Sequence, residues 1–170
     1  VTPPADLGTA GAVKFAVGNS DEPVLVASVD VLTDIDLAGA ADFHKSRGAE
    51  ATMVLTRVEL PLAYGIVITD DEGRVLRFLE KPAWGEVFSD TINTGIYLLE
   101  PSVFPAIPAG RSYDFGKELF PALLAGGHPL WGHVAEGYWR DVGDLAEYRT
   151  VHHDLLQGKI GVDIPGERHV

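Results

Sequence analysis

Cysteine is absent from the sequence, which excludes disulfide bonds and metal sites built on thiolates. The 170 residues also contain no uninterrupted apolar run of about 18 residues, the length that a membrane-spanning helix requires. No basic segment followed by an apolar one opens the chain, so no export signal is visible. We therefore expect a protein of the reducing cytoplasm that does not enter a membrane.

Positive charge is scarce as well. Thirteen lysines and arginines stand against 25 acidic residues, which gives a net charge of −12 at pH 7. Most of the surface would repel a phosphate backbone, so we do not expect nucleic-acid binding. A small anionic ligand stays open, because one lysine and a few backbone N–H groups are enough to hold it.

Signatures of covalent catalysis are missing too. The six histidines have no metal-ligand spacing, and His152 and His153, being adjacent on an expected helix, point to different faces of it. No Gly-x-Ser-x-Gly elbow occurs, and a cysteine nucleophile is impossible. Acyl-transfer chemistry therefore has no support in the sequence.

The residues that are present predict one α/β domain. Hydrophobic residues make up 46% of the chain and charged residues 22%, as in a typical globular protein. Strands that alternate with helices predict a mostly parallel sheet, with an antiparallel excursion at a hairpin over 66–80. We expect strands at 24–28, 51–58, 66–69, 75–80, 92–99 and 130–135, and helices from Asp34 or Asp36 to Arg47, over 115–124 and over 144–157. The first of these strands reads as buried on both faces.

A charged pair, Glu80 and Lys81, ends one of these strands and is fixed by Pro82. Lys81 would neutralise a phosphate, while Glu80 would accept hydrogen bonds from sugar hydroxyls. The alternative is an exposed cross-strand ion pair with no ligand.

A polar group, Asn93, Thr94 and Gly95, opens the following apolar strand. Asn93 and Thr94 would donate to hydroxyl groups, and Gly95 would let a sugar ring approach the backbone. The alternative is a β-bulge at the start of the strand. Together with the charged pair, this group is typical of a pocket for a polyhydroxylated, phosphorylated ligand.

Two aspartates stand where strands end. Asp30 follows an apolar strand, and Asp141 lies in the aromatic and glycine-rich segment 137–143. Magnesium usually takes one or two carboxylates together with substrate phosphates, so the two residues are a candidate metal pair. The alternative is that both aspartates only cap helices or turns.

A segment of small residues, 7–13, leads into an expected helix through Val17. Gly8 and Gly11 would let the backbone come close to a ligand or to another element. A plain helix-start loop and a nucleotide contact both stay open.

Six motifs in a fixed order carry a family resemblance. They are LGTAGAVK (7–14), VDVLTDIDL (29–37), YG (64–65), FLEKP (78–82), NTGIYLLEP (93–101) and GYWRDVG (137–143). In this order they resemble the sugar-phosphate nucleotidyltransferases, also called nucleoside-diphosphate-sugar pyrophosphorylases. Within this family, the sequence of residues 80–97 is most similar to that of the mannose-1-phosphate guanylyltransferase branch.

The resemblance implies a Rossmann-like sheet of the nucleotide-diphospho-sugar transferase type. It implies a reaction in which a sugar 1-phosphate, here mannose 1-phosphate, attacks the α-phosphate of an NTP, here GTP, and pyrophosphate leaves. It also implies the site: Mg²⁺ on Asp30 and Asp141; the sugar phosphate on Lys81; the sugar on Glu80, Asn93, Thr94 and Gly65; the base near Gly8 and Gly11. The catalytic residues would be Lys81, Asp30 and Asp141.

The resemblance also sets the expected domain limits. Residues 1–158 would be part of a nucleotidyltransferase catalytic domain, and 159–170 a C-terminal tail that begins a linker to a β-helix domain. Since Val1 is not a methionine and the family's nucleotide-binding glycine loop would precede it, we expect a chain truncated at the N-terminus. A further departure is Val29, where the family usually has glycine. The second hypothesis is a non-catalytic, truncated paralogue that binds a sugar phosphate and forms a homo-oligomer or pairs with a full-length relative.

Overall fold

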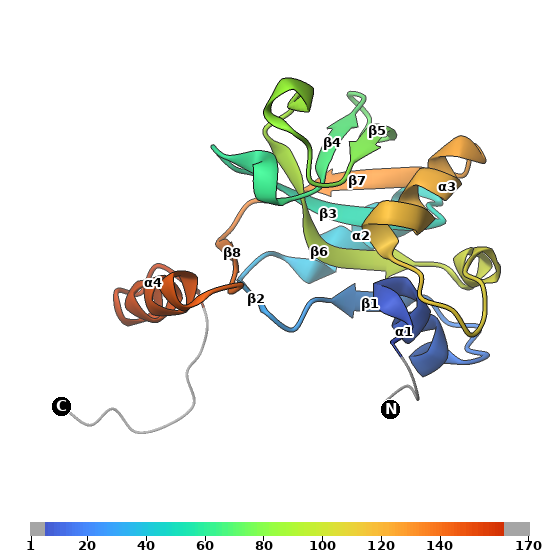
Figure 1. The fold of residues 1–170 in the computed structure, drawn as a ribbon, viewed down its shortest axis with the longest axis horizontal. Helices are drawn as coiled ribbons and strands as arrows, with labels where there is room; N and C mark the ends of the chain where they lie inside the picture. Colours follow the sequence, from blue (N-terminus) through green and yellow to red (C-terminus); the bar gives the residue numbers. More distant parts are fainter. Residues whose placement is uncertain (1–5, 162–170) are drawn as a thin grey trace.

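The computed structural model describes residues 6–161, which form a mixed sheet, a separate two-stranded ribbon and helices around them (Figure 1). The sheet contains β1 (Val24–Ala27), β3 (Ala51–Arg57), β4 (Ile66–Thr69), β5 (Val75–Leu79), β6 (Thr91–Leu99) and β7 (Leu130–Val134). The ribbon pairs β2 (Val31–Thr33) with β8 (Trp139–Asp141). The α-helices are α1 (Gly8–Val17), α2 (Leu37–Arg47), α3 (Phe120–Ala125) and α4 (Leu145–Leu156). Short helical turns cover Pro61–Ala63, Trp84–Glu86 and Pro101–Ala106, and a π-helical turn, Phe115–Leu119, leads directly into α3.

The α/β class and the antiparallel β4–β5 hairpin are confirmed, but the pairing in the sheet is less parallel than predicted. The strand order is β5-β4-β6-β3-β7, with β1 also beside β6. β6 runs antiparallel to β1, β3 and β4, so the parallel pair is β3–β7. The sequence pattern could not reveal this, because a central strand buried on both faces reads as the same apolar run whichever way its neighbours point.

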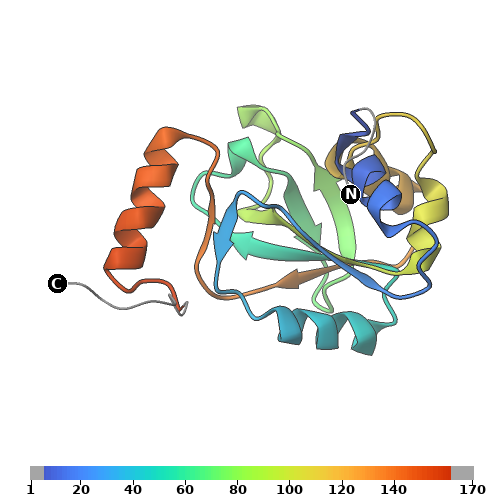
Figure 2. The ribbon, with the colours of Figure 1, turned by 90° about the horizontal axis from the view of Figure 1, so that it is seen from below.

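The core lies on both faces of the sheet. Figure 2 shows α2 on one face, with α1 and α3 on the other. Along β6, Tyr97 and Leu99 pack towards α1 and α3, while Ile96 and Leu98 pack towards α2. This alternation follows from the two-residue period of a strand.

The caps of two helices are as the sequence indicates. Asp36 accepts a hydrogen bond from the Gly39 amide at 3.0 Å and begins α2, and Gly48 ends it in the left-handed conformation. Asp144 accepts from the amides of Ala146 and Glu147 and begins α4. Asp34, the other candidate cap of α2, has a different role in the ribbon, described below.

Two local predictions are wrong. β1 is not buried on both faces: its residues alternate between half-buried and exposed, and Leu25 is 49% exposed. Among the described residues β1 pairs with β6 alone, so its other edge has no strand to cover it. The small-residue segment is not a loop either, because α1 already begins at Gly8.

The C-terminal tail is described only as far as Gly161, so its predicted role from 162 onwards lies outside the described residues. Within 6–161, none of the helices is long and apolar enough to cross a membrane.

Candidate active site

All predicted site residues except Gly8 and Gly11 line one cavity of about 190 Å³. They arrive there from separate parts of the chain: the turn before β2, the start of β4, the end of β5, the beginning of β6 and the end of β8. The predicted residues in its wall are Asp30, Gly65, Glu80, Lys81, Asn93, Thr94 and Asp141. The fold therefore brings together carboxylates, a lysine and an amide that the sequence spreads over more than half of its length.

A larger cavity of about 550 Å³ adjoins the first one. Ser28, Glu80 and Asn93 line both, so the two adjoin, and the larger one lies between α1, β1 and the start of the π-helical turn Phe115–Leu119. Val29, where the resemblance led us to expect glycine, lines the larger cavity with a fully exposed side chain. The valine therefore adds apolar surface to the larger cavity and is not packed into the core.

Asp30 and Asp141 lie side by side across the ribbon. Asp141 pairs with Val31 in the β2–β8 register, and the Val142 amide donates to the carbonyl of Asp30 at 2.7 Å. Burial, followed by the charge of Asp30, raises the pKa of the Asp141 carboxyl, and Lys81 opposes this rise. The two carboxylates are thus close enough to repel each other, which is the arrangement that a bound cation would relieve.

This carboxylate pair fits Mg²⁺ better than a metal held by protein ligands alone. Among residues 6–161, no group of three or more histidine, aspartate or glutamate side chains is placed to hold a metal ion. Magnesium usually retains water and takes one or two carboxylates plus substrate phosphates. Asp30 and Asp141 would supply the protein's share of such a coordination shell, and Lys81, which lines the same cavity, would supply a charge for a phosphate.

The Glu80 carboxylate lies in a slot between two glycines. A Cβ atom on Gly65 would lie 2.7 Å from Glu80 Oε2, and one on Gly116 would lie 2.5 Å from it. Burial, and then the charge of Asp114, raises the pKa of Glu80, while Lys81 and Lys117 lower it. Glu80 faces both cavities, where it can accept hydrogen bonds from a polyhydroxylated ligand.

Lys81 has an unusual backbone. Its φ of 44° is in the left-handed region that favours glycine, and its amide donates to the Tyr64 carbonyl at 3.2 Å. Such strain is found where the surrounding structure fixes a functional side chain. Among residues 6–161, no ion pair involves Glu80 or Lys81, so the structural alternative of a cross-strand ion pair is wrong.

Asn93, Thr94 and Gly95 form a β-bulge and also line the cavity, so both interpretations of this group hold. The β3–β6 register shifts between Val54 and Leu55, and Gly95 has a φ of +79°. Asn93 is held by the Gly95 amide, at 3.1 Å, and by its own bond to the Tyr97 hydroxyl, at 2.8 Å.

Thr94 differs from the prediction in its chemistry. Its side chain is buried, and its hydroxyl donates to the Val54 carbonyl at 2.7 Å. The hydroxyl proton is therefore already used, and Thr94 serves to fix the bulge. Asn93 remains the polar side chain of this group that reaches the cavity.

The structure does not bring Gly8 and Gly11 to the cavity of Asp30 and Asp141. Both pack against the segment 111–113: a Cβ on Gly8 would lie 2.7 Å from the Tyr113 carbonyl oxygen, and the Gly11 amide donates to that oxygen at 3.1 Å. Their small size lets α1 approach this segment closely, which fits the interpretation as a helix start. A contact with a base stays a prediction.

The sequence reasoning did not assign five residues of the cavity wall to the site: Ser28, Val31, Ala63, Tyr64 and Trp139. The Tyr64 and Trp139 rings meet edge to face with centroids 5.2 Å apart, and the Trp139 indole donates to the Thr94 carbonyl at 3.0 Å. Both aromatic residues belong to the motifs YG and GYWRDVG. The alternation of β8 would have found Trp139, because it shares a strand face with Asp141.

Comparison with known proteins gives a consistent picture. A family model described as nucleotidyl transferase matches residues 1–158. The chain is 40% identical over 166 residues to a UTP–glucose-1-phosphate uridylyltransferase of Synechocystis, a match that covers 94% of this chain and 43% of the relative. It is 41% identical over 160 residues to a mannose-1-phosphate guanylyltransferase of Mycobacterium tuberculosis, covering 93% and 44%. The chain thus spans less than half the length of these curated relatives.

Solved structures show the same fold at lower identity. A putative glucose-1-phosphate thymidylyltransferase from Bacillus anthracis, in complex with a sucrose, superposes with a TM-score of 0.75 at 22% identity, covering 94% of this chain and 63% of that one. HddC from Yersinia pseudotuberculosis complexed with GMP-PN gives a TM-score of 0.74 at 20% identity, covering 91% and 65%. These similarities support the Rossmann-like α/β fold.

Proposed function

The chain belongs to the nucleotidyl transferase family, and from this premise we propose that it carries the sugar-phosphate site of a sugar-1-phosphate nucleotidyltransferase. The reaction joins a sugar 1-phosphate to the α-phosphorus of a nucleoside triphosphate: a new phosphorus–oxygen bond forms, and the bond to pyrophosphate breaks. The observation that supports this proposal most is the single cavity that contains Asp30, Glu80, Lys81, Asn93 and Asp141.

Each polar side chain of the cavity has a part in this proposal. Lys81 holds the phosphate of the sugar 1-phosphate and offsets its charge. Glu80 and Asn93 bind hydroxyl groups of the sugar ring, and Gly65 leaves room for that ring beside Glu80. The phosphate is already ionised at neutral pH, so its oxygen needs no general base, and positioning and charge provide most of the catalysis.

Asp30 and Asp141 would hold Mg²⁺ against the phosphates. When bound, the ion would neutralise charge on the phosphates and fix their orientation. The carboxylates need no further protein ligand for this, since phosphate oxygens and water complete the shell.

The sugar and the base are proposed as mannose and guanine. Relatives with nearly equal identity to this chain are named for glucose 1-phosphate with UTP and for mannose 1-phosphate with guanylyl transfer. Residues 80–97 contribute to the proposed sugar-binding wall. Their sequence is most similar to that of the mannose-1-phosphate guanylyltransferase branch, which favours mannose. The predicted cytoplasmic location and any oligomer stay predictions.

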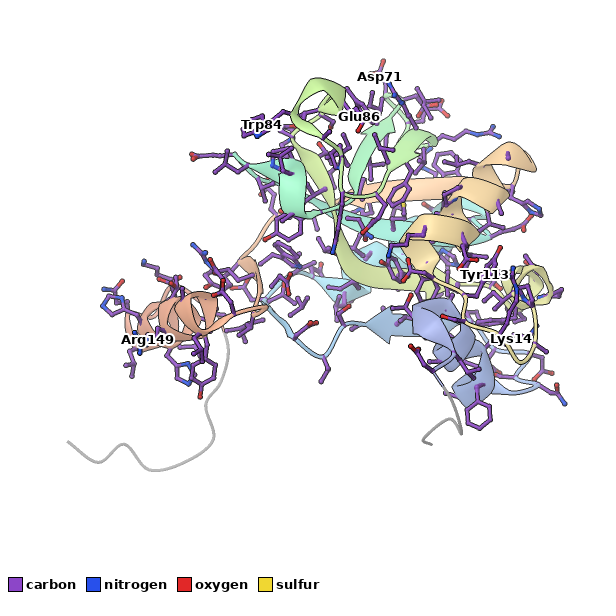
Figure 3. All side chains as sticks on the ribbon, in the orientation of Figure 1. Lys14, Asp71, Trp84, Glu86, Tyr113 and Arg149 are labelled. Atoms are coloured by element: carbon purple, nitrogen blue, oxygen red, sulfur yellow. The ribbon has the colours of Figure 1, made fainter. Side chains whose placement is uncertain are left out.

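The test is a calorimetric titration of the purified chain with mannose 1-phosphate, GTP and Mg²⁺. Glucose 1-phosphate and UTP serve as competing ligands. We expect saturable, metal-dependent binding that Asp141→Asn removes. The matched control is Asp71→Asn, which neutralises an exposed aspartate at the tip of the β4–β5 hairpin, remote from the ribbon (Figure 3).

The outcomes separate the two hypotheses. Binding of both ligands that is lost in Asp141→Asn and kept in Asp71→Asn supports the enzyme. Sugar-phosphate binding without binding of any nucleotide would favour the non-catalytic paralogue. A folded chain that binds neither ligand overturns the proposal.

A further inference from the structure

Asp154 of α4 is a buried carboxylate that the proposed chemistry does not use. It is 5% exposed, and it accepts hydrogen bonds from the Tyr138 hydroxyl at 2.9 Å and from Lys159 Nζ at 2.7 Å. The Arg140 guanidinium lies 3.8 Å away. The hydrogen bonds from Lys159 and Tyr138 keep the pKa of Asp154 below its ordinary value, so it stays ionised.

The residues that contact Asp154 alternate with those that line the cavity. Tyr138 and Arg140 reach towards Asp154, whereas Trp139 and Asp141 line the cavity. Successive side chains of a strand point to opposite faces. The contacts with Asp154 on one face of β8 therefore fix which residues occupy the other face.

The ribbon itself is short, so its orientation depends on contacts outside it, such as those of Asp34 with the Tyr138 amide and of the Trp139 indole with the Thr94 carbonyl, together with those of Asp154. β2 and β8 are three residues each and belong to a sheet of their own. Isolated two-stranded pairs are marginally stable, and a slip of one residue would exchange the two faces of β8. Such a slip would turn Asp141 away from Asp30 and place Arg140 in the cavity.

Glu147, also on α4, forms an ion pair with Arg140 at 2.7 Å. The side chains of this pair are exposed, 41% for Arg140 and 38% for Glu147. Exposed ion pairs contribute little to stability because water screens them. The more buried Asp154, which contacts both Tyr138 and Arg140, is the stronger anchor.

We propose that Asp154 is a positioning residue, which anchors β8 to α4 so that Asp141 and Trp139 face the cavity. The inference rests on the proposed function in one respect, namely that Asp141 is a metal ligand. The orientation of β8 itself can be measured without any metal, so the two can fail separately.

The first test measures hydrogen exchange of the indole N–H groups by NMR. The sequence has three tryptophans. The Trp139 indole donates to the Thr94 carbonyl, and the Trp131 indole nitrogen is buried elsewhere, so Trp131 is an internal reference. In Asp154→Ala we expect the Trp139 indole to exchange about tenfold faster or more, with Trp131 unchanged, because opening of the ribbon breaks the bond to Thr94.

Two further variants keep this test decisive if Asp154→Ala fails to fold. Asp154→Asn retains the volume and an acceptor for Tyr138 but loses the charge that pairs with Lys159 and Arg140, and Tyr138→Phe removes one hydroxyl. Both should increase exchange at Trp139. The matched control is Glu100→Gln, which weakens the His44–Glu100 contact of 3.1 Å between α2 and the end of β6. We expect it to lower thermal stability without a change at Trp139.

The second test measures Mn²⁺ binding, as a substitute for Mg²⁺, by electron paramagnetic resonance. Residues that orient metal ligands typically change metal affinity by about 10- to 100-fold when they are replaced. We expect a loss in that range for the Asp154 variants and none for Glu100→Gln. If wild type binds no Mn²⁺ while Trp139 exchange still rises in the Asp154 variants, the metal proposal fails and the positioning role stands. Folded Asp154 variants with wild-type Trp139 exchange overturn the positioning role.

Discussion

The carbonyl of Asp30, in the turn before β2, accepts a hydrogen bond of 2.7 Å from the amide of Val142, so the backbone holds Asp30 next to Asp141 of β8. Burial and the charge of Asp30 raise the pKa of Asp141. A carboxyl group with a raised pKa holds its proton more tightly in the folded than in the unfolded state. The ionised form of Asp141 therefore destabilises the fold at neutral pH.

The first prediction follows from this destabilising effect of ionised Asp141. In buffer with EDTA at pH 7, Asp141→Asn should be more stable than wild type by up to about 1 kcal/mol, after allowance for solvent screening of a half-exposed group. The difference should shrink as pH falls and wild-type Asp141 becomes protonated. Urea unfolding at several pH values measures the difference in the free energy of unfolding and its change with pH. Added Mg²⁺ should stabilise wild type alone, and an Asn variant that is less stable at pH 7 in EDTA would contradict the prediction.

The second prediction concerns the left-handed backbone of Lys81, which has a φ of 44°. Lys81→Gly and Lys81→Ala both remove the charge and should both lose affinity for a sugar 1-phosphate. Glycine tolerates this conformation, so the Gly variant should be more stable than the Ala variant by about 1 kcal/mol. The same comparison at Ala83, where φ is −73°, is the control: Ala83→Gly should lower the free energy of unfolding. Equal stability of the two Lys81 variants would show that the strain is absent.

The third prediction uses Gly116, where a Cβ atom would lie 2.5 Å from Glu80 Oε2. Because the Glu80 side chain is flexible, Gly116→Ala should displace this carboxylate and leave the fold intact. The affinity for a sugar 1-phosphate should fall about tenfold, as expected when a charged hydrogen-bond acceptor is lost, while the affinity for inorganic phosphate stays the same. Calorimetry with both ligands checks this. Gly85→Ala, which meets no atom within 4 Å, is the control.

The members of the candidate site were predictable from the sequence where polar residues at strand ends coincide with the motifs of the resembling family. Asp30, Glu80, Lys81, Asn93 and Asp141 were all predicted, from their positions at strand ends together with the family resemblance of the motifs that contain them. They line one cavity, as expected.

Contacts between distant segments could not be predicted. Nothing in the sequence connects Gly116 with Glu80, or Asp154 with the face of β8, because each contact depends on how separate elements pack. The hydroxyl of Thr94 is an example at shorter range: whether it faces a ligand or the Val54 carbonyl depends on the bulge. The antiparallel direction of β6 could not be predicted either, because the apolar residues of a strand do not indicate which way it runs relative to its neighbours.

The last prediction concerns Asp34, whose carboxylate accepts from the Tyr138 amide at 2.6 Å and from the Gly161 amide at 2.8 Å. These two backbone donors, first that of Gly161, lower the pKa of Asp34. A lowered pKa means that ionised Asp34 stabilises the fold above its ordinary pKa and that this contribution is lost as pH falls through the folded-state pKa. Asp34→Asn keeps one acceptor oxygen and should cost about 1 to 2 kcal/mol at pH 7. Measured by urea unfolding from pH 7 down to pH 3, the difference from wild type should narrow towards the acid end. A difference that stays constant over this range would mean that shape, and not the ionised carboxylate, joins the segment around Gly161 to the ribbon.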